Sequence, residues 1–377
     1  MKVLYIGHYR DVSGWARAAT DYILAMDRAG IDVVCRPVKL NESVAPVDPR
    51  IEELESKDSS GCNICIQHVL PHHLDYNGRF EKNIALYATE TSNFFFSSWG
   101  KKINCMDEAW VINQSMIESS RKSGVDIPIK VIPHTCEISK FEKNVEPIDL
   151  GEYNSNFIFY FVGDANKRKN LPALIRAFNT EFTINESATL LLKVNKYGVE
   201  REELNSMISS LCTDVKAGLK LYGNPEFYPK EIIITGYMSE DQILSLHHRC
   251  DCFVAPSHGE AWCIPAFDAM ALGNTPICGR VGGMIDFLKD GGGVLVDGSS
   301  EPVFGMLETF QDIYTGREDW FNIDTRSLQK EMRSVYESWK NKDDSYIEMK
   351  RKGMEIADKY SYESIGNLIK QELENAN

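Results

Sequence analysis

Short apolar runs alternate with amphipathic stretches along most of the chain. Residues 2–7 form an apolar run that predicts a buried strand, residues 15–29 have the spacing of an amphipathic helix, and residues 31–36 predict a second strand. The same patterns predict further strands at 63–67, 84–88, 130–133, 157–162, 189–194, 232–235, 252–255, 275–278 and 294–297, and helices at 171–182, 239–250, 266–272, 301–314, 325–339 and 360–373. Strands that alternate with helices are typical of βαβ units around a parallel sheet. We therefore expect an α/β protein.

The length and one polar segment together indicate two domains. The chain has 377 residues, which corresponds to about two domains. Residues 143–156 are polar and contain Pro147, Gly151 and several acidic residues, a composition that is typical of a linker. We therefore expect a first domain at residues 1–145 and a second domain at residues 154–358.

Composition excludes some classes of protein and leaves others open. Hydrophobic residues make up 43% and charged residues 25% of the chain, as in soluble globular proteins. The net charge of −14 argues against a protein that binds nucleic acid through phosphate contacts. The ten cysteines are scattered, and Cys62-x-x-Cys65 has no second pair at zinc spacing. We expect reduced thiols and a cytoplasmic location, with no signal peptide and no transmembrane segment.

One stretch of the second half has the pattern of a ligand-binding corner. Cys252–Ala255 predicts a buried strand, a polar loop follows, and Pro265 is at a position suited to the first turn of a helix. Ligands bind at the carboxyl ends of parallel strands, where helix N-termini offer free N–H groups to phosphates. Glu260 and Asp268 lie eight positions apart at this corner and can accept hydrogen bonds from sugar hydroxyls. The corner therefore indicates a ligand that combines sugar and phosphate, although an ordinary βα corner with two surface acids has the same spacing.

The sequence of this corner resembles a family motif. It reads E-A-W-C-I-P-A-F-D-A-M-A-L-G-N-T-P from Glu260 onwards. This is similar to the Glu-x7-Glu region of retaining glycosyltransferase family 4 (glycosyl transferases group 1), whose members have the GT-B fold. Glu260 stands at the first acid and Asp268 at the second, while Ala261 and Cys263 replace two family glycines. The resemblance extends over most of the chain, so we expect two Rossmann-like parallel-sheet domains facing a central cleft, with a C-terminal helix at about 360–377 that joins the first domain.

The resemblance also implies roles for residues of the second domain. Glu260 would hold the hydroxyls of the donor sugar, and Asp268 would hold the ribose. The loop G-D-A-N-K-R-K-N at 163–170 matches the family's phosphate-facing loop, so Lys169 and Arg168 would stabilise the diphosphate leaving group as charge develops. The turn Gly282-Gly283 matches a second family glycine turn near the donor. The remaining donor-binding candidates are positions whose backbone would lie near the phosphates or the base: Ala261, Trp262, Cys263, Ile264, Gly236, Tyr237 and Met238.

The first domain supplies weaker candidates. The loop after the first strand lacks G-x-G-x-x-G, so a dinucleotide fingerprint is absent. Gly14 matches the family's donor-side glycine loop and Arg17 its acceptor side, although Arg17 is equally compatible with a solvated helix position. His68 follows a strand, where the family often places a histidine that faces the cleft. The resemblance therefore implies a catalytic role for His68, and a structural role is the alternative. Glu90 in T-E-T would bind the acceptor.

Together these features predict a metal-independent hexosyltransferase that retains the anomeric configuration. No D-x-D motif is present, so we expect no metal site and no cofactor, with a UDP- or GDP-sugar as donor substrate. The acceptor would be a glycan or glycoconjugate. Three alternatives stay open: a nucleotide-sugar epimerase or phosphorylase of the same fold, a glycosyltransferase that acts on a modified base in DNA, and a non-catalytic protein that binds sugar nucleotides.

Overall fold

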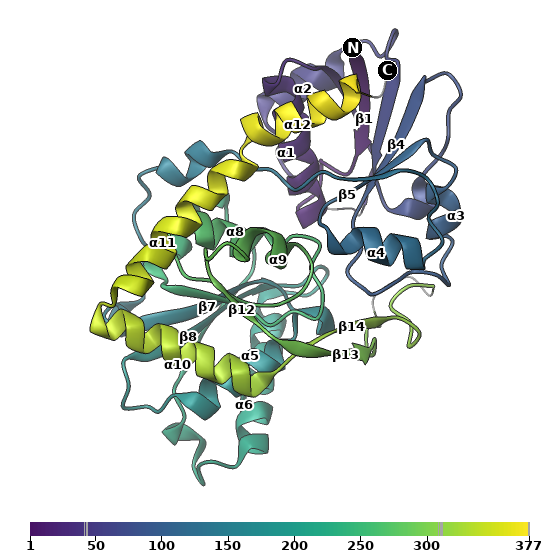
Figure 1. The fold of residues 1–377 in the computed structure, drawn as a ribbon. Helices are drawn as coiled ribbons and strands as arrows, with labels where there is room; N and C mark the ends of the chain where they lie inside the picture. Colours follow the sequence, from purple (N-terminus) through teal and green to yellow (C-terminus); the bar gives the residue numbers. More distant parts are fainter. Residues whose placement is uncertain (41, 43, 308, 310–311, 376–377) are drawn as a thin grey trace. The chain divides into compact units, whose positions relative to one another are not determined.

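The computed structural model describes residues 1–377 except 41, 43, 308, 310–311 and 376–377. It divides into two compact units (Figure 1). Unit 1 consists of Met1–Lys140, Thr309–Asp319 and Asp358–Asn377, and unit 2 consists of Phe141–Glu308 and Trp320–Ala357. Each unit is built around a parallel sheet of six strands. No helix of the described residues is long and apolar enough to cross a membrane.

The sheet of unit 1 has the strand order β2-β1-β3-β4-β5-β6. Its strands are β1 (Lys2–Gly7), β2 (Asp32–Pro37), β3 (Ile64–His68), β4 (Lys82–Tyr87), β5 (Glu108–Val111) and β6 (Ile129–Val131). Its helices are α1 (Gly14–Arg28), α2 (Pro49–Ser56), α3 (Trp99–Ile103), α4 (Ser115–Lys122) and α12 (Tyr362–Glu374). The order makes β1 and β3 parallel neighbours inside the sheet, so the segments that follow their carboxyl ends lie side by side.

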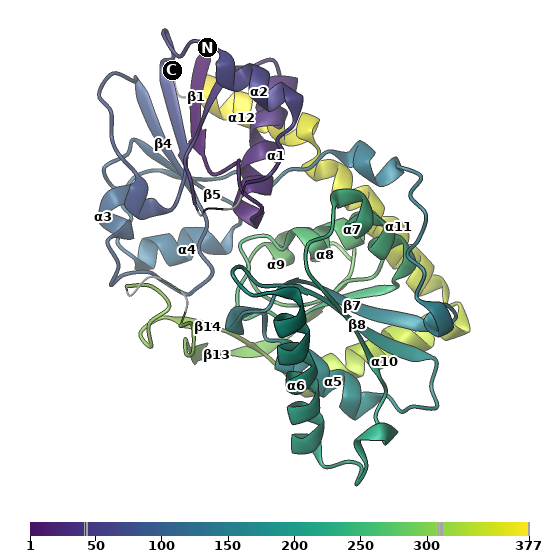
Figure 2. The same ribbon diagram turned by 180° about the vertical axis from the view of Figure 1, so that it is seen from behind.

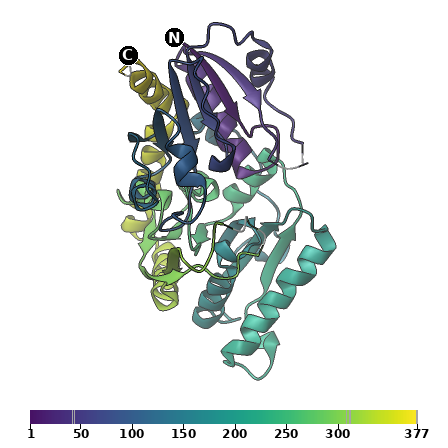
Figure 3. The ribbon, with the colours of Figure 1, turned by 90° about the vertical axis from the view of Figure 1, so that its right-hand side faces the viewer.

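The C-terminal helix α12 packs against α1 in unit 1 (Figure 3). The two helices approach closely at Gly366, where a Cβ atom would lie 2.3 Å from the carbonyl oxygen of Ala25. The hydroxyl of Tyr362 donates a hydrogen bond of 2.5 Å to the buried carboxylate of Asp21. Ile365 and Ile369 complete the apolar core on this face of the sheet. The tail of the chain is therefore an integral part of unit 1.

The sheet of unit 2 has the strand order β12-β11-β10-β7-β8-β9. Its strands are β7 (Phe157–Asp164), β8 (Ala188–Asn195), β9 (Glu231–Thr235), β10 (Cys252–Ala255), β11 (Ile277–Gly279) and β12 (Val294–Val296), and a separate pair is formed by β13 (Gly298–Pro302) and β14 (Asp319–Ile323). Its helices are α5 (Leu171–Glu181), α6 (Arg201–Leu219), α7 (Glu240–Arg249), α8 (Ile264–Ala271), α9 (Gly283–Leu288), α10 (Thr325–Asn341) and α11 (Asp344–Ala357). Helices α5, α6 and α10 cover one face of this sheet, and α8, α9 and α11 lie on the other (Figures 1 and 2).

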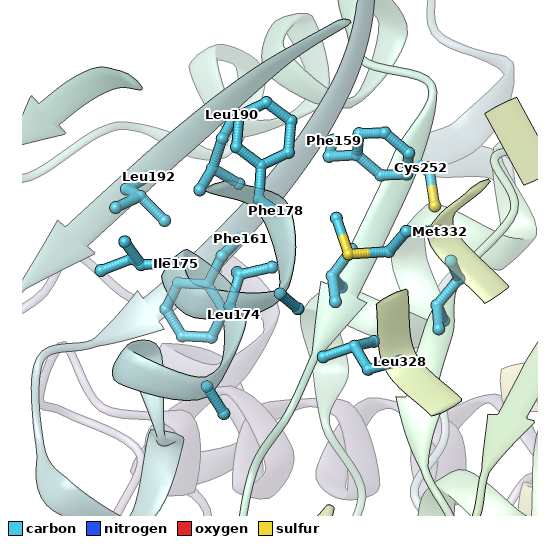
Figure 4. Packing of buried hydrophobic residues seen from close by; sticks show 14 of the residues in the cluster. Phe159, Phe161, Leu174, Ile175, Phe178, Leu190, Leu192, Cys252, Leu328 and Met332 are labelled. Carbon is cyan, nitrogen blue, oxygen red and sulfur yellow. The ribbon is translucent and has the colours of Figure 1, made fainter. Parts of the chain in front are cut away.

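Strand alternation decides which side chains of unit 2 enter its main core. Phe159 and Phe161 of β7 point to the same face as Leu190 and Leu192 of β8, where they meet side chains of α5 and α10 such as Met332 (Figure 4). Successive residues of a strand point to opposite faces. The intervening residues of β7 and β8 therefore point to the α8 side of the sheet, which is the side of the candidate site.

The helix expected at residues 301–314 is wrong for the described residues. Residues 301–302 end β13, and residues 303–307 form no helix. Gly305 has φ +85° and Tyr314 has φ +56°, conformations that no α-helix contains. Phe304 and Leu307 are 80% and 92% exposed, so this apolar spacing had no core to cover. Residues 308 and 310–311 of the expected helix lie outside the described residues.

The structure also adds elements that the pattern did not resolve. Helix α6 is one continuous helix (Figure 3), whereas the sequence indicated only partial helix in this polar region. Strand β14 and helix α11 were not expected. Thr309–Asp319 belongs to unit 1, although the sequence placed residues 154–358 together in the second domain. A hydrogen bond explains why this segment belongs to unit 1, because the backbone N–H of Ser92 donates to the carbonyl oxygen of Asp319 at 2.8 Å.

Candidate functional site

The candidate site of unit 2 is built on the corner between β10 and α8, residues 252–283, which we name the Glu260 corner. The fully buried strand β10 ends at Ala255, and the loop that follows leads to Cys263 at the start of α8. Cys263 has φ +73°, a left-handed conformation that favours glycine. The backbone thus keeps the shape that glycine adopts most easily, although a cysteine occupies the position. Pro265 fits the first turn because its missing N–H would have had no partner there.

The backbone turn at Gly282 packs against the backbone of Glu260. Gly282 has φ +57°, and a Cβ atom there would lie 1.7 Å from the carbonyl oxygen of Glu260. At Gly283 a Cβ atom would lie 2.5 Å from the carbonyl oxygen of Ala261. Only glycine permits this approach of the two backbones. The glycine pair noted in the sequence therefore has a direct structural reason, because it lets the start of α9 pack against the loop that carries Glu260.

Three charged side chains meet at the Glu260 corner. The Nζ atom of Lys169 lies 2.6 Å from Oε1 of Glu260, and a guanidinium nitrogen of Arg168 lies 3.2 Å from Oε2. The side chains of both cations are 13% exposed and that of Glu260 is 6% exposed. Arg168 also donates a hydrogen bond of 2.6 Å to the carbonyl oxygen of Gly259. The ion-paired cluster has two cations and one carboxylate, so Glu260 alone does not neutralise the cations, which suit an anionic ligand. Asp164 at the end of β7 is a further acid near both cations, and burial raises its pKa.

The cations determine the ionisation of Glu260. Burial alone would raise the pKa of Glu260, but the charges of Lys169 and Arg168 and the hydrogen bond from Lys169 outweigh burial and lower the pKa to about 2. Glu260 is therefore a carboxylate at neutral pH and can accept hydrogen bonds from hydroxyl groups. It is not a proton donor in this state.

The loop after β7 fixes the two cations in place. The side chain of Asn166 accepts a hydrogen bond of 3.2 Å from the backbone N–H of Lys169. Asn170 has φ +53°, and its side chain donates to the carbonyl oxygen of Pro256 at 3.2 Å. The backbone N–H of His258 donates to the carbonyl oxygen of Arg168 at 2.8 Å. These bonds join the loops at the ends of β7 and β10, which are neighbours in the sheet.

The other donor-side candidates lie around the same corner. Asp268 is on α8 and is 8% exposed. Ala261 is 9% exposed, and Ile264 is the first residue of α8. The ring of Trp262 is buried against Phe287, with 5.2 Å between ring centroids, so its side chain is part of the core and only its backbone could face a ligand.

The expected base-contacting turn follows β9 at the edge of the same sheet. Gly236 has φ +91°, which lets the chain turn sharply from β9 toward α7. The side chain of Tyr237 is 76% exposed, whereas Met238 is partly buried. The side chain of Ser239 accepts a hydrogen bond from the backbone N–H of Gln242, which completes a capping box for α7. The predicted contact between this turn and a base stays a prediction.

In unit 1, His68 ends β3 and is 1% exposed. Its Nδ1 atom lies 2.6 Å from the hydroxyl oxygen of Tyr5, and the rings of Trp15 and Tyr22 pack against it at centroid distances of 5.1 and 5.7 Å. Burial, together with the neighbouring histidines, lowers the pKa of His68 to about 3. The imidazole is therefore neutral at pH 7. Its predicted catalytic role stays a prediction.

The remaining candidates of unit 1 have different surroundings. Arg17 lies on α1 and forms an ion pair of 2.9 Å with the buried carboxylate of Asp21. Gly14 is exposed at the start of α1, and a Cβ atom there would meet no protein atom within 4 Å. Glu90 is partly buried and accepts a hydrogen bond from the hydroxyl of Tyr314. The partner of Glu90 thus comes from a segment 224 positions later in the chain.

Sequence reasoning missed two residues that bear on the candidate site. Tyr314 gave no signal because it fell within an expected helix. The sequence does contain a signal for Lys193, because a lysine there interrupts the apolar run of β8. In the structure this lysine is only 1% exposed. Among the described residues, no cluster of three or more His, Cys, Asp or Glu side chains could hold a metal ion.

Comparisons of sequence match part of the chain. Residues 217–304 match the sequence model of the family described as glycosyl transferases group 1. Lipopolysaccharide 1,2-N-acetylglucosaminetransferase of Salmonella typhimurium is 23% identical over 138 residues, which are 36% of this chain and 33% of that protein. The chain therefore matches about a third of the length of this relative.

Comparisons of structure cover the whole chain. Sucrose-phosphate synthase from Thermosynechococcus elongatus has a TM-score of 0.66 at 14% identity, and the match covers 100% of this chain and 99% of that one. Anabaena Alr3699/HepE in complex with UDP-glucose has a TM-score of 0.66 at 12% identity, with both chains covered completely. The fold is GT-B. Within this GT-B chain, the match at 217–304 includes Gly236, Glu260, Asp268 and Gly282.

Proposed function

We propose that this GT-B protein is a retaining glycosyltransferase. It would transfer a hexose from a UDP- or GDP-sugar to a glycan or glycoconjugate. Support comes from the family match that spans the Glu260 corner and from structural neighbours such as HepE, whose structure contains UDP-glucose. The low identities leave the donor, the acceptor and the stereochemical outcome as parts of the proposal.

The observation that carries the proposal is the cluster of Glu260 with Lys169 and Arg168. A nucleotide sugar presents hydroxyls on its sugar and negative charge on its diphosphate. Glu260 is ionised and can accept hydrogen bonds from the hydroxyls, while the two cations offer N–H donors to phosphate oxygens. Lys169 has three donors and uses one on Glu260, so it can contact both parts of a donor at once.

In the proposed reaction, the bond between the anomeric carbon and the phosphate oxygen breaks as the acceptor oxygen forms a new bond on the same face of the sugar. The proton of the acceptor hydroxyl passes to the departing phosphate oxygen. Lys169, Arg168 and the N–H groups at the start of α8 would stabilise the negative charge that develops on the diphosphate. Because this stabilisation grows as the bond breaks, it would lower the barrier rather than only strengthen binding.

The replacement of a family glycine by Cys263 is compatible with catalysis. Cys263 keeps a left-handed backbone despite its side chain, so the path of the loop does not depend on glycine at this position. The thiol of Cys263 is 8% exposed, and burial, together with the charge of Glu260, raises its pKa to about 12. The thiol is therefore neutral at pH 7 and adds no negative charge that would repel a diphosphate.

A donor screen tests the proposal. The full chain is incubated with UDP-glucose, GDP-mannose, ADP-glucose, dTDP-glucose and CMP-sialic acid, and released nucleotide is measured with and without a panel of methyl hexosides. We expect slow release from one donor, faster release with one hexoside, and a product that keeps the anomeric configuration of the donor by proton NMR. Inversion would refute retention, and failure of every donor to bind would refute the proposed function.

A matched pair of variants assigns the reaction to the Glu260 corner. Glu260→Gln removes the carboxylate charge at the candidate site and is expected to abolish release. Glu231→Gln is the control, because Glu231 forms an equally short ion pair of 2.6 Å with Lys216 and is as deeply buried, but lies at the start of β9, opposite the carboxyl edge of the sheet. Equal loss of release in both variants would show that Glu260 acts only through stability.

A further inference from the structure

Lys193 is a buried lysine of β8, the strand next to the edge strand β9 in the sheet of unit 2. It lies near the end of β8, between Leu192 and Val194, and is 1% exposed. Leu192 and Val194 point into the main core, so the alternation of the strand directs Lys193 to the opposite face, which is the α8 side. Lysines are almost never fully buried unless they have a partner. A cation at this position is therefore unusual for a purely structural strand.

The side chain of Lys193 extends toward the carboxyl edge of the sheet. Its Nζ atom donates a hydrogen bond of 2.5 Å to Oδ1 of Asn195, which is two residues further along the same face of β8. Asn195 is exposed, so the ammonium group lies just beneath the surface at this edge. Ligands of open parallel sheets bind beyond the carboxyl ends of the strands. Lys193 thus places a cation at the edge where the candidate site is located.

Lys193 has no carboxylate partner among the described residues. Its ammonium group donates to the neutral amide of Asn195, and burial lowers its pKa to about 8. The contrast with Lys216 is direct, because that partly buried lysine of the same unit is paired with Glu231 at 2.6 Å. An ammonium group has three donors. Lys193 therefore has donors to offer to an oxygen atom of a ligand.

The neighbours of Lys193 indicate which part of a ligand it would meet. In the register of the sheet, Lys193 pairs with Val162 of β7 on one side and with Ile234 of β9 on the other. Gly236 follows Ile234 by two residues and begins the turn for which we predict contact with the base. The cations expected to hold the diphosphate follow β7 and meet the loop after β10. Lys193 is therefore on the base side of the proposed donor site.

We propose that Lys193 selects nucleotides whose base has a carbonyl oxygen at C4 of a pyrimidine or at C6 of a purine. This inference rests on the proposed function. Uracil, thymine and guanine have a carbonyl oxygen where cytosine and adenine have an amino group. An ammonium group donates to a carbonyl oxygen but has no acceptor for an amino group. The site would therefore accept UDP-, dTDP- or GDP-sugars and reject CDP- and ADP-sugars.

The experiment measures dissociation constants of UDP, GDP, CDP and ADP by isothermal titration with the full chain and with Lys193→Met. Methionine has a similar length and suits a buried position, so the variant should fold. We expect the wild-type protein to bind UDP or GDP about ten- to a hundredfold more tightly than CDP and ADP, since a hydrogen bond to a charged group contributes that much. In Lys193→Met, this preference should fall to about threefold or less.

Two controls separate a contact with the base from a contact with the phosphates and from a general loss of stability. Lys216→Met removes a partly buried lysine at a distance from the proposed base site and should keep the wild-type preference. Inorganic pyrophosphate reports on the phosphate region, and its binding should be the same in the wild type and in Lys193→Met. An equal loss for pyrophosphate would place Lys193 at the phosphates and overturn the base assignment.

The outcomes also distinguish this inference from the proposed function. Tight binding of ADP, or an unchanged preference in Lys193→Met, would refute the role of Lys193 and leave the glycosyltransferase proposal intact. If the wild-type protein binds none of the four nucleotides, the proposed function and this inference are both refuted.

Discussion

Glu260→Gln is expected to destabilise unit 2 by an amount that the structure allows us to work out. Glutamine has nearly the shape of a protonated glutamate but cannot ionise, so it removes the charge and leaves Lys169 and Arg168 without their counter-ion. The pKa of Glu260 is about 2 instead of the ordinary 4.5. This difference corresponds to about 3 kcal/mol of stabilisation at pH 7, which is within the range measured for breaking buried ion pairs.

The sign of the pH dependence follows from the direction of the pKa. The pKa of Glu260 is lower in the folded protein than in the unfolded chain, so the stabilisation is fully present above pH 4.5 and is lost as the pH falls toward 2. The difference in unfolding free energy between wild type and Glu260→Gln should therefore shrink from about 3 kcal/mol at pH 7 to about 2 kcal/mol at pH 3.5.

The assay is urea unfolding followed by circular dichroism at pH 7 and at pH 3.5, with thermal unfolding as a second measure. For a domain of this size the expected loss corresponds to a decrease of about 6 to 12 °C in melting temperature at pH 7. Asp297→Asn is the control, because the ion pair of Asp297 with Arg280 is exposed and should contribute less than about 1 kcal/mol. A loss below about 1 kcal/mol for Glu260→Gln, or a loss that does not change with pH, would refute the assigned role of the ion pairs.

Three further substitutions have defined outcomes. Gly282→Ala should destabilise the protein by about 3 kcal/mol or more in urea unfolding, because the new Cβ atom would lie 1.7 Å from the carbonyl oxygen of Glu260; a normal midpoint would contradict this packing. Lys169→Met should reduce the rate of nucleotide release about 10²- to 10³-fold, measured at saturating donor, and an unchanged rate would remove Lys169 from the proposed reaction. Tyr314→Phe removes the hydrogen bond to Glu90 and should cost about 1.5 to 3 kcal/mol in unfolding free energy, whereas no loss would show that this bond does not form in solution.

Much of the sheet architecture could be predicted from the sequence. The run F-I-F-Y-F-V at the start of β7 and the helical spacing of α5 are strong local signals, and their bounds differ from the structure by at most two residues. The strand at Cys252–Ala255 was predicted with its observed bounds. These signals are reliable because buried parallel strands consist of short apolar runs that are bounded by turn residues.

Other features depend on contacts between distant segments, which no local pattern contains. The expected helix at 301–314 fails because its apolar residues have no core to cover, as the exposed side chains of Phe304 and Leu307 show. The contact between Glu90 and Tyr314 joins residues far apart in the chain. The ion pair between Glu260 and Lys169 could be anticipated only through the family resemblance, since the two residues are 91 positions apart.

The central claim is that unit 2 binds a nucleotide sugar at the Glu260 corner. The most direct measurement is isothermal titration of the full chain, Glu231→Gln and Glu260→Gln with UDP-glucose and with GDP-mannose. We predict that one of these donors binds the wild type and Glu231→Gln with a dissociation constant between about 1 μM and 1 mM, the usual range for enzyme substrates, and binds Glu260→Gln at least about tenfold more weakly. Absence of binding to the wild type, or equal binding to Glu260→Gln, would contradict the claim.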